Sequence, residues 1–259
     1  MTLRRAWTWA VRYLPAVVVF AAVIVLWEIV TGGGGRRVIP PPSAILNAGL
    51  DNFEVLRRSA LATAFEALGG LAIGSVGGIL VAFATARWVT ARDVLLPVAI
   101  ATSAVPIIAV APILNNWFGV LNPLSKMMMA ALLVFFPVMI NVTRGLVEVQ
   151  PAALELMRSY AAGETAVLRK VRIPNTLPFL FTALKVGATL SFIGALVGEY
   201  FGGTSEVIGR IVIQSMSSGR YSLAWAGILV GALAAIAAYI AITLVERLAI
   251  PWHAALRTE

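Results

Sequence analysis

Long apolar runs, separated by short polar segments, follow one another along the whole chain. Six of them are long enough to cross or nearly cross a hydrocarbon core about 30 Å thick, at about 1.5 Å per helical residue: Leu14–Val30, Leu61–Ala86, Val94–Leu114, Leu124–Val142, Phe179–Phe201 and Leu223–Val245. Helices are expected because single strands would leave backbone groups unpaired in lipid. The pattern predicts an all-α, polytopic membrane protein of about six transmembrane helices, with one transmembrane domain over residues 1–259.

Composition agrees with this interpretation. Of the 259 residues, 60% are hydrophobic and only 12% are charged, whereas soluble domains carry about 25% charged residues. The net charge of +8 fits basic cytoplasmic loops better than binding to nucleic acid. Because the chain has no cysteine and a single histidine, His253, we expect no metal site and no catalytic residue in it.

The first apolar run has two interpretations. Arg4, Arg5 and Arg12, followed by Leu14–Val30, resemble a secretory signal. However, this run is longer than a usual signal core, and Trp27 and its neighbours stand where a small-residue cleavage site would be. We therefore expect a retained first helix.

The distribution of Lys and Arg predicts the orientation. With the N-terminus inside, twelve lie in cytoplasmic segments: Arg4, Arg5, Arg12, Arg87, Arg92, Arg144, Arg158, Arg169, Lys170, Arg172, Arg247 and Arg257. Seven lie in outer segments: Arg36, Arg37, Arg57, Arg58, Lys126, Arg210 and Arg220. This bias predicts that both termini are cytoplasmic.

The first outer segment is expected to contain a short helix. Pro40–Pro42 cannot continue a helix, and Ser43 suits the N-cap position that follows. From Ile45 to Leu56 apolar residues recur at helical spacing. The helix would lie on the membrane surface or serve as a packed connector.

Two spans carry residues that shape helix packing. Gly70, Gly74 and Gly78 form a smooth face, which favours packing within the same bundle over a subunit or gate contact. Pro106 and Pro112 interrupt the third span. They fit a pore-lining segment and a bent packing helix equally well.

Three ionisable residues fall within predicted spans. Such residues are costly in lipid and are functional candidates by default. Glu66 and Lys185 lie near span ends, where their head groups could reach the interface. Glu199, in a Gly-Glu-Tyr-Phe-Gly-Gly stretch near the outer end of the fifth span, is the best candidate for a gate or a structural hydrogen bond.

The polar, basic segment 144–176 separates the fourth and fifth spans. Pro151 suits the start of a helix, a turn is expected near Gly163, and Pro174 and Pro178 are expected to stop a second helix ending near Arg172. This cytoplasmic helix–turn–helix could transmit force from a soluble partner.

This segment resembles the EAA loop of ABC importer permeases, a Glu-Ala-Ala-x-x-x-Gly pattern followed by Ile-x-Leu-Pro. Glu155 takes the place of the Glu and Pro174 that of the final Pro, while Ala161 and Ile173 replace the Gly and the Leu. Gly163 is expected to serve the turn instead. Three further stretches are similar to the nitrate, sulfonate and taurine branch, which includes importers of pyrimidine precursors and riboflavin: Ala109–Leu114, Phe135–Pro137 and Gly198–Glu199.

The resemblance implies a type I importer permease in the bacterial inner membrane, with a coupling helix between spans four and five. It implies a homodimer, or a pair with a closely similar permease, two cytoplasmic ATPase subunits and an extracytoplasmic solute-binding protein. ATP and Mg²⁺ would bind the ATPase, and no cofactor is expected in this chain, which has no Gly-Lys dipeptide and hence no P-loop. The expected contacts with the ATPase are Glu155, Ala161, Gly163, Arg169, Lys170, Ile173 and Pro174, and the gate or pathway candidates are Glu199, Pro106 and Pro112.

Two other classes of protein are weighed against this interpretation. An ion-coupled secondary transporter would need midplane charges and inverted repeats. An intramembrane enzyme would need a nucleophile with its base, or metal ligands. The sequence offers little for either, and it does not identify the transported solute.

Reporter fusions test the predicted orientation. Fusions at Arg37, Gln150 and the C-terminus should read outside, inside and inside, because basic residues are retained on the cytoplasmic side. An external Gln150 would contradict both the topology and the cytoplasmic placement of the loop.

Overall fold

The computed structural model describes residues 3–33, 38–88, 94, 97–102 and 105–252, and its regular elements are helices. In order they are α1 (Leu3–Thr31), α2 (Pro42–Asp51), α3 (Phe53–Arg87), α5 (Ile107–Phe118), α6 (Pro123–Val147), α7 (Pro151–Ser159), α8 (Glu164–Val167), η1 (Leu168–Arg172), α9 (Ile173–Phe201), α10 (Ile208–Ser217) and α11 (Tyr221–Ala249). Within the described residues, five helical segments are long and apolar enough to cross a membrane: Leu14–Thr31, Phe53–Arg87, Pro123–Val147, Glu164–Phe201 and Tyr221–Ala249. The predicted all-α membrane architecture is confirmed.

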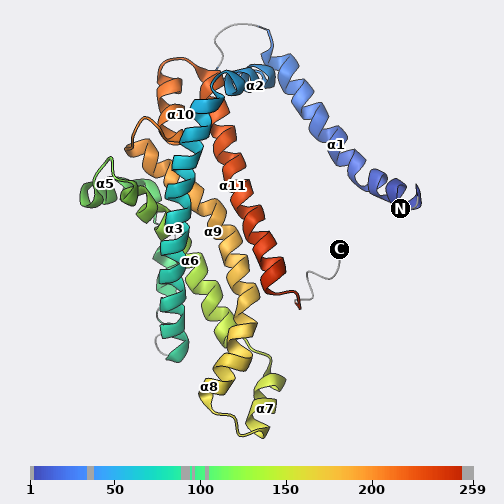
Figure 1. The fold of residues 1–259 in the computed structure, drawn as a ribbon, viewed down its shortest axis with the longest axis vertical. Coiled ribbons are helices and arrows are strands. Elements are labelled where there is room, and N and C mark those ends of the chain that lie inside the picture. Colours follow the sequence, from blue (N-terminus) through green and yellow to red (C-terminus); the bar gives the residue numbers. More distant parts are fainter. Residues whose placement is uncertain (1–2, 34–37, 89–93, 95–96, 103–104, 253–259) are drawn as a thin grey trace.

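The third predicted span, Val94–Leu114, is interrupted at Pro106, as its prolines led us to expect, whereas Pro112 lies inside a helix. Residues 95–96 and 103–104 lie outside the described part, but the backbone at Pro106 is extended, and α5 begins only at Ile107. Proline lacks the N–H that would continue a preceding helix, which explains the break. The 12-residue α5 is too short to span a membrane and lies at an angle to the long helices (Figure 1).

The centre of the molecule is a three-helix core of α3, α6 and α9, which contact one another. Figure 1 shows these helices running side by side. A buried cluster joins them: Ala82, Val134, Val138, Val142, Leu146 and Ala183. The core is made of small and β-branched side chains, so the helix axes lie close together.

The glycine face of α3 packs against α6. A Cβ atom at Gly74 would lie 2.9 Å from Cβ of Val134, and one at Gly78 would lie 2.8 Å from the carbonyl oxygen of Phe135. The expectation that this face packs within the same bundle is confirmed. Gly194 gives α9 the same close approach, because its Cβ would lie 2.6 Å from Cα of Ala130 on α6.

Helix α1 contacts α2 near its own C-terminal end and points away from the bundle in Figure 1. Glu28 links it to α2, since its carboxylate accepts hydrogen bonds from the Ser43 N–H at 3.0 Å and the Ser43 hydroxyl at 2.6 Å. The expected Ser43 N-cap is therefore wrong. Pro41 occupies that position, and an acidic side chain from α1 supplies the acceptor at the helix start.

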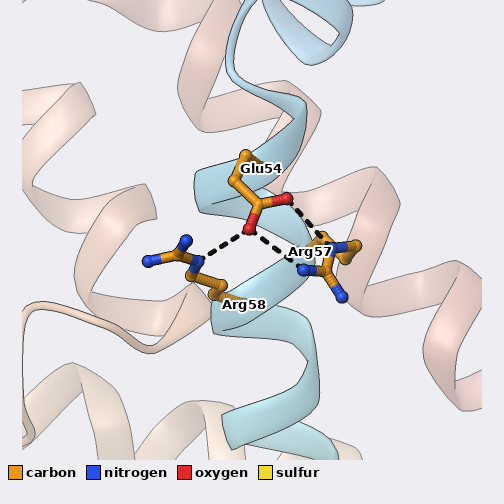
Figure 2. A network of polar contacts seen from close by, with 3 residues as sticks. All are labelled: Glu54, Arg57 and Arg58. Carbon is orange, nitrogen blue, oxygen red and sulfur yellow. Dashed lines mark hydrogen bonds and ion pairs between the residues drawn. The ribbon is translucent and has the colours of Figure 1, made fainter.

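The expected amphipathic helix from Ile45 to Leu56 is divided in two. Asn52 ends α2 and precedes the first residue of α3, so Arg57 and Arg58 belong to the second turn of a 35-residue helix. Glu54 accepts from both arginines within that helix, at 3.0–3.1 Å from Arg57 and 2.7 Å from Arg58 (Figure 2). All three side chains are exposed, so this network contributes little to stability.

Substitution of Gly194 tests the close packing of α6 and α9. Gly194→Ala should lower the free energy of unfolding by about 1–3 kcal/mol, because the added methyl group overpacks a backbone contact. The melting temperature in detergent is the measurement. Gly231→Ala is the matched control, since its Cβ would meet Leu196 at an ordinary 3.5 Å. Equal melting temperatures for the two variants would contradict the packing.

Candidate functional site

Glu199 lies in the last turn of α9 and is fully buried, at 0% exposure. Its Oε2 accepts a hydrogen bond of 2.6 Å from the N–H of Gly209, the second residue of α10. The first residue, Ile208, donates its N–H to Thr63 Oγ1 of α3 at 3.1 Å. Side chains from α9 and α3 thus satisfy two of the backbone donors that a helix start leaves free.

Two more buried ionisable side chains interact with Glu199. Glu66, on α3, is 5% exposed, and Lys126, on α6, is 0% exposed. The Lys126 ammonium attracts both carboxylates electrostatically. Two expectations are therefore wrong: Glu66 does not reach the interface, and Lys126 belongs to the helical core rather than to an outer loop.

Lys126 also fastens the turn that precedes its own helix. Its Nζ donates to the carbonyl oxygen of Val120, and it lies 3.4 Å from that of Asn122. The space around the cluster is filled closely, because a Cβ at Gly198 would lie 3.0 Å from Cγ of Lys126, and one at Gly209 would lie 2.7 Å from Cβ of Glu199. We call Glu66, Lys126 and Glu199 the outer charge cluster.

Lys185 forms a second buried contact, between α9 and α11. Its Nζ lies 2.8 Å from Oε2 of Glu246. The expectation that Lys185 reaches the interface is wrong, because its ammonium pairs with Glu246 between two helices. Glu246 was missed because it stands one residue beyond the sixth predicted span; its position in the first polar turn after an apolar run was the available signal.

The two proline candidates lie on α5, away from its buried side. Pro106 is the N-cap of α5 and Pro112 lies inside it, and both are exposed on the single chain. The buried polar residue of this helix is Asn115, whose Nδ2 would lie 3.3 Å from a Cβ at Gly202, next to the end of α9. Sequence reasoning missed Asn115.

The segment predicted to face the ATPase forms a helical hairpin beyond the three-helix core (Figure 1). Helix α7 ends in a Schellman motif, since Ala161 N–H donates to Arg158 at 2.9 Å and Ala162 N–H to Met157 at 3.0 Å. Ala161 has φ +48°, a left-handed conformation that favours glycine. Ala161 thus makes the turn, and the expectation that Gly163 replaces it there is wrong, because φ of Gly163 is −69°.

The second arm of the hairpin continues into the membrane without a stop. Helix α8, the π-helical η1 and α9 form one helical segment, Glu164–Phe201. Pro174 lies in the first turn of α9 and Pro178 inside it, so the expected stops are wrong. The wider π turn just before Pro174 includes Lys170, whose carbonyl group the Pro174 ring would meet in a regular helix.

Three contacts hold the hairpin to the core. Asn175 Nδ2 donates to the carbonyl oxygens of Gly145 at 2.8 Å and Glu148 at 3.2 Å, where α6 ends. Arg87, at the end of α3, lies 3.8 Å from Glu164 in an exposed ion pair. Glu155, Gly163, Arg169 and Lys170 remain exposed, whereas Ile173 and Pro174 are half-buried at the base.

Comparison with known proteins gives consistent relatives. The family of binding-protein-dependent transport system inner membrane components matches residues 74–251. A probable ABC transporter permease protein of Haemophilus influenzae is 29% identical over 222 residues, which cover 85% of this chain and 90% of the relative. The formylaminopyrimidine transport permease protein of Halalkalibacterium halodurans is 31% identical, over 71% of this chain and 73% of the relative. The riboflavin transport system permease protein of Chloroflexus aurantiacus is 32% identical, over 65% of this chain and 61% of the relative.

The long apolar helices and the buried charges define a multi-pass helical membrane protein. With the match over 74–251, the chain belongs to the family of binding-protein-dependent transport system inner membrane components. The family consists of membrane permease subunits of ABC importers, which are not themselves enzymes.

Substitutions in the hairpin turn test its left-handed residue. Ala161→Gly should stabilise the turn by about 1 kcal/mol, because glycine adopts a left-handed conformation without the Cβ clash. Trypsin should then cleave the folded protein more slowly after Arg158. Ala162→Gly, one residue later, is the control and should accelerate cleavage, since it only adds freedom to the unfolded turn. The same rate change in both variants would contradict the motif.

Proposed function

We propose that this chain forms the translocation path for a small solute, which an extracytoplasmic binding protein delivers and a separate ATPase drives inward. The solute is of the sulfonate, taurine, nitrate, pyrimidine-precursor or riboflavin type. The names of the formylaminopyrimidine and riboflavin relatives support this range. The observation that carries the proposal is the exposed hairpin of α7, α8 and η1, which is continuous with a core helix.

The working unit would contain two permeases, either two copies of this chain or this chain with a closely similar one. Two ATPase subunits would bind ATP and Mg²⁺ on the cytoplasmic side, and no cofactor would bind this chain. Residues 1–259 would form one transmembrane domain in the bacterial inner membrane, with both termini in the cytoplasm. The twelve-to-seven excess of cytoplasmic Lys and Arg supported this orientation, and moving the buried Lys126 out of the outer group strengthens it.

The hairpin within 144–176 would dock into a groove on the ATPase. Helix α7 exposes Leu156 and Tyr160, which are 56% and 74% exposed, and apolar side chains at such a tip favour a protein contact. The inserted part would be the turn of Ala161 and Gly163. The remaining contacts would come from Glu155, Arg169 and Lys170, with Ile173 and Pro174 at the base.

A movement at the hairpin could reach the outer end along a single element. The helical segment Glu164–Phe201 carries hairpin residues at one end and Glu199 at the other, about 50 Å away at 1.5 Å per residue. Glu199, Pro106 and Pro112 are the gate or pathway residues that we propose. Glu199 is supported by its complete burial and its hydrogen bond to α10, and Pro106 by its place at the helix break that precedes α5. Pro112 is supported by its place inside the short helix α5.

Uptake into proteoliposomes tests the function. Vesicles that contain the permease with its ATPase and binding protein should take up solute only when ATP is supplied on the ATPase side. Uptake driven by an ion gradient without ATP would show an ion-coupled secondary transporter instead.

Gly163→Trp tests the docking of the hairpin. Nothing lies within 4 Å of a Cβ at Gly163, so the folded chain has room for the indole, whereas a close-fitting groove on the ATPase does not. Pull-down of the ATPase should be lost and ATP-dependent uptake should fall more than about tenfold, because a central interface clash costs several kcal/mol. Ser205→Trp, in an exposed turn beyond the other end of α9, is the control. Normal binding and uptake in Gly163→Trp would show that this hairpin is not the coupling element.

A further inference from the structure

The outer charge cluster needs a physical explanation beyond packing. Three ionisable side chains lie together inside a helical bundle that faces lipid, where burying a charge is costly. They come from three helices of the core, α3, α6 and α9, and they gather where α10 begins. An apolar core could pack the same helices, so the charges point to a role in holding α10.

Helix α10 depends on this cluster for its first hydrogen bonds. Gly209 donates its N–H to Glu199, and Ile208 donates its N–H to Thr63. The contact is tight, since a Cβ at Gly209 would lie 2.9 Å from Oε2 of Glu199. The start of α10 is therefore held from α9 and from α3 at once.

Lys126 balances the charge of the cluster. Among the described residues, Oε1 of Glu199 and Oε2 of Glu66 are buried without a hydrogen-bond partner. The Lys126 ammonium attracts both carboxyl groups electrostatically across a poorly screened interior. The same ammonium holds the carbonyl of Val120, so the turn between α5 and α6 is tied to the cluster as well.

We propose that the outer charge cluster is a positioning device, in which Lys126 and Glu66 keep the Glu199 carboxylate on the start of α10. Through it, a displacement of α6 or α9 is passed to α10 and to the turn between α5 and α6. The role of this device, to move the outer end of the permease, rests on the proposed function. The labelling experiment that tests it does not. Lys126 and Glu66 are positioning residues, and Glu199 makes the contact.

A single cysteine can report the position of α10, because the chain has none of its own. Ser215, on α10, is 1% exposed, so the thiol of Ser215→Cys should react slowly with a membrane-impermeant maleimide. Ser217→Cys, exposed on the same helix, gives the reference rate. The full chain is used in membranes.

Removal of the Lys126 charge should release α10. Lys126→Met leaves two buried carboxylates without their cation, which should raise the labelling rate of Cys at 215 by about tenfold or more, since breaking a buried charge pair is strongly destabilising. Adding Glu66→Gln to Lys126→Met removes one of the two buried carboxyl groups that have lost the ammonium. This second change should return labelling to within about threefold of the original rate.

The pair Lys185 and Glu246 supplies the matched control. Lys185→Met also strands a buried carboxylate, but at the contact of α9 with α11. It should leave the ratio of labelling at 215 and 217 unchanged. An equal rise with Lys185→Met, no rise with Lys126→Met, or no recovery with Glu66→Gln would each overturn the proposal.

Labelling also separates this proposal from the proposed function. The ratio of rates at 215 and 217 measures the position of α10, whether or not solute is transported. If uptake proves independent of ATP while the labelling pattern holds, the importer function fails and the positioning device stands. If uptake depends on ATP and the labelling pattern fails, only the device is lost.

Discussion

Close approach of α3, α6 and α9 at their glycines is the constraint on which the other contacts depend. In lipid there is no hydrophobic force between helices, so association relies on van der Waals contact and on interhelical polar bonds. Gly74 and Gly194 bring α3 and α9 against the same stretch of α6, around Ala130, at distances that no side chain would allow. The Glu199 carboxyl group can then be attracted by the Lys126 ammonium while its Oε2 accepts a hydrogen bond from Gly209 of α10.

The close approach of the helices also positions the polar groups within the core. Lys185 and Glu246 pair directly at 2.8 Å, and each is satisfied by the other. The outer charge cluster works differently, because its lysine donates to main-chain carbonyls and its carboxylates serve α10. One helix, α9, contributes to both sites, and its continuation through η1 forms an arm of the hairpin. A displacement of this helix would therefore act on the hairpin, the ion pair and α10 together.

Hydropathy predicted the positions of the helices well where a helix is apolar along the whole length that crosses the membrane. The second predicted span, Leu61–Ala86, lies inside α3, but the helix begins at Phe53, because amphipathic turns that lengthen a helix carry no hydropathy signal. Every proline in these segments was expected to interrupt or stop a helix, and this was too simple. Pro106 does break its span, whereas Pro174 and Pro178 are accommodated after a π turn that local sequence does not reveal.

The sequence predicted some residues of the candidate sites and missed others, depending on where they stand in the apolar runs. Glu199 stood out because a carboxylate inside an apolar run is unusual. Lys126 and Glu246 lie at the edges of such runs, where only the tertiary packing decides between solvent and core. The turn at Ala161 was placed two residues late, since glycine is the usual left-handed residue and alanine adopts that conformation only when the hydrogen bonds of the motif impose it.

Amide hydrogen exchange measures directly how firmly the core holds the start of α10. The N–H groups of a helix's first turn are normally free to exchange, because they have no partner within the helix. In the reconstituted protein, those of Ile208 and Gly209 should exchange as slowly as the amides of the buried stretch around Gly74 in α3. Exchange at Ile208 and Gly209 as fast as in the exposed turn near Ser218 would contradict the account.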